Sequence, residues 1–407
     1  MRVLQVNCVL NNSSSTGKLT GALHTYLLEH GIDSVAVYGY GVGSFDRSVK
    51  LCSDYYVKGN HLRARLSGLM YGGCEVSTER LKRLIINQKP DIVHLQCING
   101  FFINIYRLIA WLRDQKIPTV LTLHAEFMYT ANCGHALECD KWQSGCGNCP
   151  NRKKATESLF FDRTAESFQK MRKAFEGFDD DLRVVSVSPW LMERARLSPI
   201  LKDKQHSCIL NGLDTDTFHP HTDFGFAEQF RIPGKKTVLF VLRRFTGKTG
   251  DFKGSDRVIR LAEKLRDHGI VFLVTGENCA EYELPDNIIF TGGAVSQRQL
   301  AELYSFADVT LIASKKETFS MIVAESLCCG TPVVGFRAGA PEQIALSEYS
   351  EFVRQDDIEG LCSATEKWTQ NDFSPSIISE KASAVYSEER MCREYLALYQ
   401  TFLNERH

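Results

Sequence analysis

Short apolar segments alternate with amphipathic segments along the whole chain, and this alternation restricts the fold more than any other feature. Strands are predicted at residues 2–8, 34–39, 91–95, 119–124, 183–187 and 206–210, and the pattern continues in "KTVLFVL", "IVFLVTG", "NIIFTGG", "ADVTLIAS" and "TPVVGF". The segments between them, such as "GKLTGALHTYLLEHG", have helical periodicity and end at Gly or Pro. Alternation of this kind predicts α/β architecture with parallel sheets covered on both faces.

The length of 407 residues predicts two domains, because a chain of this size exceeds one ordinary core. The segment "NGLDTDTFHPHTDFG" is rich in Asn, Asp, Gly, Pro and His, which is typical of a linker. The sequence therefore predicts domains at 1–210 and 225–387, a linker at 211–224, and a terminal helical segment at 388–407. Ligands of doubly wound sheets bind at the carboxyl ends of the strands, so we expect function in a cleft between the domains.

The composition excludes several classes of protein. No apolar run approaches the ~18 residues of a membrane span, and "MRVLQVNCVL" turns polar too early for a signal peptide. Residues 1–205 hold 27 Lys and Arg against 20 Asp and Glu, while the rest of the chain holds 21 against 29. The basic half lacks a concentrated Arg/Lys-aromatic tract, which argues against nucleic-acid binding. The sequence predicts a cytoplasmic protein whose two halves differ in role.

One segment of the basic half suggests contact with a membrane surface. In "YVKGNHLRARLSGLMYG", three leucines recur at helical spacing beside cations: Leu62, Leu66 and Leu69 next to Lys58, Arg63 and Arg65. This pattern predicts an interfacial helix that docks peripherally on an anionic membrane, at the inner face of the plasma membrane. The alternative is that the leucines pack on the core of the first domain.

The segment "ASKKETFSMIVAESLCCGTPVVGF" carries two carboxylates, Glu317 and Glu325, on either side of a predicted helix start near Phe319. Thr318 or Ser320 could cap this helix. Its first backbone N–H groups would form an anion site, and they come from Phe319, Ser320 and Met321. A carboxylate, an anion site and a second carboxylate in this order suit the sugar hydroxyls, the diphosphate and the ribose hydroxyls of a nucleotide sugar. The alternative is that both glutamates are solvated helix residues.

Two further motifs fit the same ligand. In "VLFVLRRFTGKTGDFKGSDRVI", Arg243 follows a strand and Lys253 precedes a helix, and two such cations suit a diphosphate leaving group. The spacing between them is long, so Arg244 is an alternative to Arg243. In the first half, "NNSSSTGKLTG" joins a strand to a helix through small residues, and Gly17 would let a ligand approach the backbone.

Together these motifs, with "NGLDTDTFHP" and "GFRAGAPEQI", resemble retaining glycosyltransferase family 4, which has the GT-B fold. The resemblance implies two Rossmann-like domains facing across a cleft, with the terminal helix crossing back to the first domain. It implies that the second domain binds a nucleotide diphosphate sugar and the first binds the acceptor, a glycan or a polyprenyl-diphosphate-linked oligosaccharide. It implies no catalytic metal and no protein nucleophile.

The resemblance also assigns residues. Glu317 would contact hydroxyls of the donor sugar, Glu325 the ribose, and Arg243 with Lys253 the diphosphate. His124, at the end of "TVLTLH", matches the family's cleft histidine near the transferred sugar, and His94 in "DIVHLQ" is similarly placed. The alternative for His124 is a satisfied histidine at a strand end.

Four cysteines lie within "CGHALECDKWQSGCGNCP", at positions 133, 139, 146 and 149. This stretch resembles the Cys-rich insert of exopolysaccharide glycosyltransferases of the colanic-acid type. A reducing compartment disfavours disulfides, and a redox role fits poorly because the insert is not a thioredoxin-like strand–helix junction. Four thiolates in a short polar loop suit tetrahedral zinc. The prediction is a structural zinc site formed by Cys133, Cys139, Cys146 and Cys149, with four unliganded thiols as the alternative.

Two other functions stay open at this point. Another GT-B enzyme, such as a nucleotide-sugar 2-epimerase, would share the fold and the nucleotide site but not the acceptor surface. A non-enzymatic binding module with a zinc-clipped loop would bind nucleotide sugars without turnover.

Overall fold

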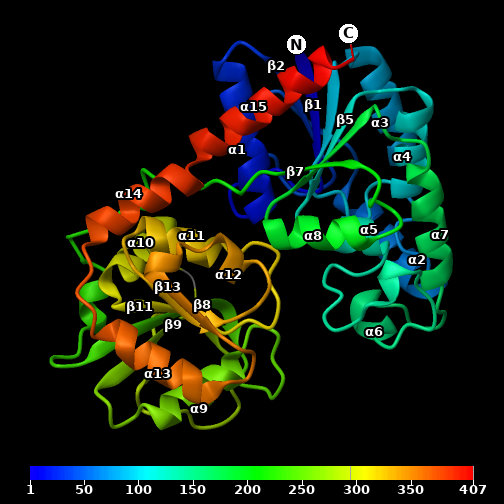
Figure 1. The fold of residues 1–407 in the computed structure, drawn as a ribbon. Helices are drawn as coiled ribbons and strands as arrows, with labels where there is room; N and C mark the ends of the chain where they lie inside the picture. The colour runs from blue at the N-terminus through cyan, green and yellow to red at the C-terminus, as the bar shows by residue number, and fades with distance from the viewer. Residues whose placement is uncertain (294, 407) are drawn as a thin grey trace. The chain divides into compact units, whose positions relative to one another are not determined.

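The structure is a computed structural model that describes residues 1–293 and 295–406. The chain divides into two compact units, each with one sheet in which all paired strands are parallel (Figure 1). Unit 1 comprises Met1–Leu210 and the chain from Met391 onward, and unit 2 comprises Asn211–Arg390. The predicted α/β class with two parallel-sheet domains is confirmed. Residues 211–224 cluster with unit 2.

The sheet of unit 1 has seven strands in the order β3-β2-β1-β4-β5-β6-β7. Their bounds are β1 Arg2–Asn7, β2 Asp33–Tyr38, β3 Ser48–Lys50, β4 Ile92–Leu95, β5 Thr119–Leu123, β6 Leu182–Ser186 and β7 Gln205–Cys208. Six of these strands were predicted to within about two residues. The three-residue edge strand β3 was missed, because it is too short to carry a pattern.

The helices of unit 1 lie between these strands, apart from the last one. Their bounds are α1 Ser15–Glu29, α2 Asp54–Ser67, α3 Glu75–Gln88, α4 Ile105–Asp114, α5 Phe127–Thr130, α6 Arg152–Ala155, α7 Thr164–Phe175, α8 Pro189–Leu197 and α15 Glu388–Asn404, with a short 3-10 helix at Lys141–Gln143.

Helix α15 packs on the sheet of unit 1 together with α1 (Figure 1, red and blue). The buried side chains of this layer include Val3 and Ile92 from the strands, Leu23 from α1, and Tyr395 and Tyr399 from α15. Each large apolar side chain buried in this way stabilises the unit by about 1.5–3 kcal/mol. The return of the terminal helix to the first domain, which the resemblance implied, is therefore observed.

Unit 2 has a six-stranded sheet in the order β10-β9-β8-β11-β12-β13. Its strands are β8 Lys236–Phe245, β9 Ile270–Asn278, β10 Ile288–Phe290, β11 Val309–Ile312, β12 Val333–Phe336 and β13 Ser350–Val353. Its helices are α9 Ser255–Lys264, α10 Gln297–Phe306, α11 Met321–Cys328, α12 Pro341–Ile344, α13 Ile358–Thr369 and α14 Pro375–Tyr386, with 3-10 helices at Ala227–Phe230 and Ser347–Tyr349. Helices α9 and α13 lie side by side on one face (Figure 1).

The carboxyl ends of β8, β11 and β12 carry the loops in which the predicted donor residues lie. Gly254 begins α9 with a φ of 83°, and a Cβ at this position would collide with the carbonyl of Ala313, just after β11. Only glycine combines this backbone with such a close approach. The loops after β8 and β11 are therefore held against each other.

No helix of the described residues is both long and apolar enough to cross a bilayer.

Candidate functional site

Lys253 and Glu317 form a direct ion pair at the carboxyl edge of the unit 2 sheet. The Nζ atom of Lys253 lies 2.6 Å from Oε1 of Glu317. The lysine side chain is 48% exposed and the glutamate 15% exposed. The structure thus brings together one predicted cation and one predicted carboxylate, although 64 residues separate them in the chain.

The backbone of Glu317 is held in place by the loop after β12. Its N–H donates to the carbonyl of Ala338 over 2.9 Å, and its own carbonyl accepts from the N–H of Ala340 over 3.2 Å. The carboxylate of Glu342 in turn accepts the N–H groups of Ala338 and Gly339. The motif "GFRAGAPEQI" therefore acts as a support that fixes Glu317.

Helix α11 begins at Met321, two residues later than predicted, and Ser320 precedes it in a left-handed conformation with a φ of 84°. The Ser320 side chain makes no capping hydrogen bond, and its hydroxyl is buried without a hydrogen-bond partner among the described residues. The predicted capping role of Ser320 is wrong. Strained backbone of this kind is concentrated at ligand sites. The buried Phe319 anchors the turn.

Glu325, on the second turn of α11, is oriented by a neighbouring helix. The hydroxyl of the fully buried Tyr304 in α10 donates to Oε2 of Glu325 over 2.9 Å. Tyr304 is itself fixed, because its carbonyl accepts a hydrogen bond from Thr331. Sequence reasoning missed Tyr304, since a tyrosine inside an amphipathic helix carries no signal of its own.

The two arginines near the end of β8 have different surroundings. Arg244 lies 3.7 Å from a carboxylate oxygen of Glu277 and 3.5 Å from the sulfur of Cys279, both on or next to β9. Arg243 is exposed, and no carboxylate among the described residues lies within ion-pair distance of it. The pairing of β8 with β9 shifts in register between Val241 and Arg244. These surroundings favour Arg243 as the cation available to a ligand.

The long segment between Arg244 and Lys253 is ordered by Asp251. Its carboxylate accepts hydrogen bonds from the Thr246 hydroxyl, the Lys253 backbone and the Ser255 hydroxyl. The carbonyl of Phe252 also accepts the N–H of Lys315 over 2.9 Å. The extra residues therefore form a fixed loop that places Lys253 beside Glu317.

In unit 1, His124 and His94 are linked through Gln96. The Nε2 atom of His124 lies 2.9 Å from Oε1 of Gln96, and Nε2 of Gln96 lies 3.3 Å from Nδ1 of His94. Burial lowers the pKa of His124 to about 4 and that of His94 to about 3. Both histidines are therefore neutral at pH 7, and sequence reasoning missed the glutamine between them.

Gly17 lies in the first turn of α1 instead of in a loop. A Cβ at this position would lie 2.6 Å from the carbonyl oxygen of Asn11, so the backbone of Asn11 occupies the space next to it. The glycine is thus explained by packing, and its predicted contact with the donor rests on the motif alone.

The four cysteines of the insert are free thiols. Burial raises the pKa of Cys133 to about 12, and the nearby thiols of Cys146, Cys149 and Cys139 raise it further. Nevertheless, no group of three or more Cys, His, Asp or Glu residues among those described is placed to hold a metal ion. The structure therefore does not show the predicted zinc site, although the four thiols share one neighbourhood.

The insert is anchored by a buried ion pair that sequence reasoning missed. Arg194 Nε lies 2.7 Å from Oε1 of the fully buried Glu126, which also accepts the N–H of Ala136 and the hydroxyl of Tyr129. The Arg194 guanidinium lies 4.8 Å from the ring of Trp142, a fully buried residue of the insert. The Glu126–Arg194 ion pair and the buried ring of Trp142 therefore hold the insert in place.

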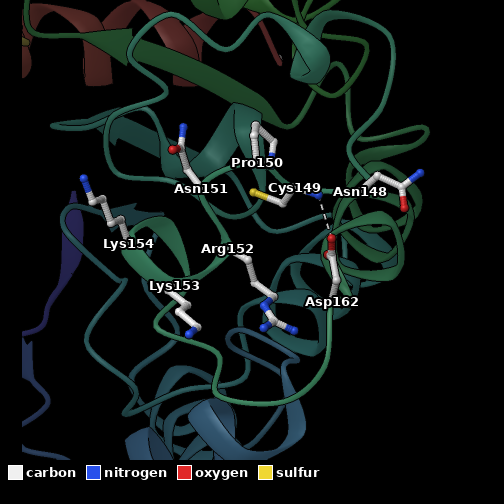
Figure 2. Close-up of a pocket in the computed structure, with 8 residues that line it drawn as sticks. All are labelled: Asn148, Cys149, Pro150, Asn151, Arg152, Lys153, Lys154 and Asp162. Atoms are coloured by element: carbon white, nitrogen blue, oxygen red, sulfur yellow. Dashed lines mark hydrogen bonds between the residues drawn. The ribbon is translucent and has the colours of Figure 1, made fainter.

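After the cysteines, Arg152, Lys153 and Lys154 line an open pocket with Cys149 and Asp162 (Figure 2). The backbone N–H of Cys149 donates to the Asp162 carboxylate over 2.6 Å, drawn as the dashed line in Figure 2. The lysine side chains point to different sides of this pocket, and neither has an ion-pair partner among the described residues. The cations that line this pocket therefore form a cationic surface next to the insert.

Two solved structures share the fold. Sucrose-phosphate synthase from Thermosynechococcus elongatus aligns over 99% of both chains with a TM-score of 0.68 and 15% identity. The HepE protein of Anabaena, solved in complex with UDP-glucose, aligns over 98% of this chain and 100% of its own with a TM-score of 0.62 and 11% identity. At these identities the likeness concerns the fold, and the fold is GT-B.

A known domain family matches the sequence of unit 2. Residues 225–385 match the family described as "Glycosyl transferases group 1", so the chain carries a group 1 glycosyltransferase domain. Over 98% of its length the chain is 21% identical to the whole of "Putative colanic acid biosynthesis glycosyl transferase WcaC" from Escherichia coli K12. It is 26% identical, over 78% of its length and 90% of the relative, to "Alpha-galactosylglucosyldiacylglycerol synthase" from Streptococcus pneumoniae. The resemblance seen in the motifs is confirmed.

Proposed function

We propose that this chain is a retaining hexosyltransferase that uses a nucleotide diphosphate sugar as donor. The acceptor is a glycan or a polyprenyl-diphosphate-linked oligosaccharide, and the pathway is exopolysaccharide or capsule biosynthesis. The observation that carries the proposal is the Lys253–Glu317 pair beside the strained start of α11. The full-length similarity to a relative named for colanic acid biosynthesis supports the pathway.

On the donor side, the diphosphate competes with Glu317 for Lys253. The Lys253 ammonium, about half exposed, can turn from the carboxylate to a phosphate oxygen without unfolding any structure. Glu317, which its backbone contacts hold in place, is then available to accept hydrogen bonds from sugar hydroxyls. Arg243 adds a second cation, and both stabilise the negative charge that grows on the leaving diphosphate.

Glu325 binds the ribose hydroxyls in this proposal, and Tyr304 orients its carboxylate. The N–H groups at the start of α11, together with the Ser320 hydroxyl, receive a phosphate. His124 in unit 1 makes a hydrogen bond near the transferred sugar. The acceptor hydroxyl attacks from the face that the diphosphate leaves, so the anomeric configuration is retained.

We also propose that unit 1 docks on an anionic membrane, where a lipid-linked acceptor resides. Leu62 and Leu66 are 52% and 44% exposed on α2, as the docking proposal requires. Leu69 lies beyond the end of α2 at Ser67, so its predicted place on this helix is wrong.

A second apolar segment adjoins α2. Its exposed side chains are Leu159, Phe160 and Phe161. The N–H of Leu159 donates to the carbonyl of Arg65 over 2.9 Å, which ties this segment to the helix. Arg152, one of the cations in Figure 2, donates to the backbone carbonyl of Phe160 over 2.7 Å, so the cationic pocket adjoins this segment. Exposed apolar side chains beside unpaired lysines suit an anionic lipid surface.

Zinc binding by the insert is a separate proposal. The spacing of the four cysteines and their shared neighbourhood support zinc binding, although the thiols would have to move closer to one another. The ion would order the insert and take no part in sugar transfer.

Donor binding tests the proposed function. Isothermal titration with UDP-, GDP- and ADP-sugars is expected to identify one donor that binds wild-type protein and binds Lys253→Met more weakly. Lys381→Met is the matched control, because Lys381 forms a similar ion pair with Glu348 elsewhere in unit 2. Equal binding by both variants would contradict the proposed site.

A further inference from the structure

A chain of hydrogen bonds runs from helix α15 to His124. The hydroxyl of Tyr399 lies 2.6 Å from Nδ1 of His94. Gln96 reaches the same nitrogen with its amide nitrogen over 3.3 Å, and its amide oxygen lies 2.9 Å from Nε2 of His124. Tyr399, His94 and Gln96 are all buried. We call these four residues the Tyr399–His124 chain.

Strand geometry explains why these side chains meet. His94 and Gln96 are two residues apart at the end of β4, as are Thr122 and His124 at the end of β5, and side chains two apart share a face of the sheet. This face is the one that α15 covers, since Tyr395 and Tyr399 pack on it.

The hydrogen bonds define where the protons are. In the arrangement with the Gln96 amide nitrogen toward His94, that nitrogen donates to Nδ1, so Nδ1 is unprotonated and the His94 proton sits on Nε2, which donates it to the Thr122 hydroxyl over 2.8 Å. The oxygen of the same amide then faces His124 and can only accept. His124 therefore carries its proton on Nε2, which leaves Nδ1 as a hydrogen-bond acceptor.

In the opposite arrangement the Gln96 amide is flipped and both histidines are protonated on the other nitrogen. The hydrogen bonds between Gln96 and the two histidines are then kept with donor and acceptor exchanged, but Tyr399 can no longer donate to Nδ1 of His94. Its phenol proton would then lack an acceptor, because His94 is its side-chain hydrogen-bond partner among the described residues. A buried hydroxyl without an acceptor costs about 1–3 kcal/mol. The Tyr399 hydroxyl thus selects one of the two arrangements.

We propose that Tyr399 of the terminal helix is a positioning residue that, through His94 and Gln96, fixes the tautomer of His124. This inference rests on the proposed role of His124 beside the transferred sugar. It adds that the proton of the neutral His124 ring lies on Nε2, toward Gln96, so that Nδ1 can accept a hydrogen bond but cannot donate one. The terminal helix therefore contributes to the acceptor side of the reaction without touching substrate.

The test is nitrogen NMR of protein with ¹⁵N-labelled histidine, at pH 7 and without substrate. Wild-type protein is expected to show His124 protonated on Nε2 only. Tyr399→Phe is expected to show a mixture of both tautomers at His124, with kcat lowered about tenfold and donor KM unchanged. Tyr106→Phe is the matched control, because it removes a buried hydroxyl of unit 1 that bonds to the carbonyl of Met70, outside the Tyr399–His124 chain. It is expected to keep the wild-type tautomer and kcat.

Gln96→Met provides a second variant, which cuts the chain beside His124. Adding Tyr399→Phe to it is expected to change neither the His124 tautomer nor kcat further, as for coupled residues. A single Nε2–H tautomer at His124 in Tyr399→Phe, or the same change in Tyr106→Phe, would overturn the inference. Since the NMR measurement needs no turnover, a tautomer change without transferase activity would support the chain and contradict only the proposed function.

Discussion

The ammonium of Lys253 lies 2.6 Å from the carboxylate of Glu317, across the loops that follow β8 and β11. Such a partly exposed pair contributes only about 0.2–1 kcal/mol to stability. A diphosphate with more negative charge than one carboxylate can therefore displace Glu317 from Lys253 at little cost. The pair is best understood as a site whose two members separate when the donor binds.

Removal of the Glu317 carboxylate tests this interpretation. Glu317→Gln is expected to lower kcat by about 10- to 100-fold with little change in donor KM, because its contacts with the sugar strengthen as the sugar gains positive charge. Steady-state kinetics measures both constants. Glu348→Gln, in the exposed pair with Lys381, is the control and is expected to behave as wild type. Wild-type turnover by Glu317→Gln would refute the assignment.

Tyr304 and Glu325 are expected to affect donor binding instead of the chemical step. Glu325→Gln weakens the contact with the ribose, and Tyr304→Phe removes the hydroxyl that orients the carboxylate. Each is expected to raise donor KM, by about tenfold for Glu325→Gln and less for Tyr304→Phe, with kcat nearly unchanged. An unaltered KM in both variants would show that the ribose binds elsewhere.

Membrane docking is expected to depend on charge and on the aromatic segment. Wild-type protein should float with vesicles that contain anionic lipid, and less so as salt rises to physiological strength, because each cation near the surface contributes about 1 kcal/mol. Lys153→Glu with Lys154→Glu should reduce flotation, as should Phe160→Ser with Phe161→Ser.

The matched control for docking is Lys202→Glu with Lys235→Glu, which makes the same change in net charge at exposed positions outside this surface. Equal loss of flotation in both lysine pairs would mean that net charge alone matters. Equal recovery with neutral and anionic vesicles, or none with either, would rule out docking by this surface.

Elemental analysis decides the zinc proposal. Protein purified without added metal is expected to carry about one zinc per chain, and Cys146→Ser with Cys149→Ser should lose it. Cys52→Ser with Cys279→Ser is the control, because these cysteines lie outside the insert. Four titratable thiols in metal-free, fully active protein would show that the Glu126–Arg194 pair and Trp142 hold the insert without metal.

The buried histidines predict a loss of stability in acid. Burial lowers the pKa of His94 to about 3 and of His124 to about 4, below the 6.5 of an exposed histidine. Below pH 6.5 the unfolded chain therefore binds more protons than the folded chain, and stability falls by up to about 1.4 kcal/mol per pH unit for each histidine, until the folded pKa is reached.

Urea unfolding at pH 7 and pH 5 measures this effect. His94→Gln is expected to reduce the difference between the two pH values, while His30→Gln, at an exposed position, should leave it unchanged. An identical pH dependence in wild type and His94→Gln would contradict the account of the buried pair.

Much of the fold was predictable because parallel strands are short and apolar. Segments such as 119–124 were placed within one or two residues of β5, since both faces of the strand are buried. The edge strand β3 is three half-buried residues, and no apolar pattern marks it. The start of α11 was placed too early, because Ser320 resembles a cap in sequence while its backbone is left-handed.

The candidate site was predictable as residue types and not as geometry. A carboxylate after one strand and a lysine after another indicated a donor site, but their pairing depends on how Gly254 packs against Ala313. The anchor of the insert was missed for a similar reason. Trp142 lies in a polar loop, and its burial depends on Arg194, 52 residues further on, which no local pattern connects to it.

Product analysis tests the central claim most directly. The protein would be incubated with the donor found by titration and a polyprenyl-diphosphate-linked oligosaccharide, and the anomeric configuration of the product read by proton NMR. The account predicts release of nucleoside diphosphate only when acceptor is present, and a new glycosidic bond with the anomeric configuration of the donor. An inverted bond would contradict retention, and release or epimerisation of the donor without acceptor would contradict the assignment as a glycosyltransferase of this kind.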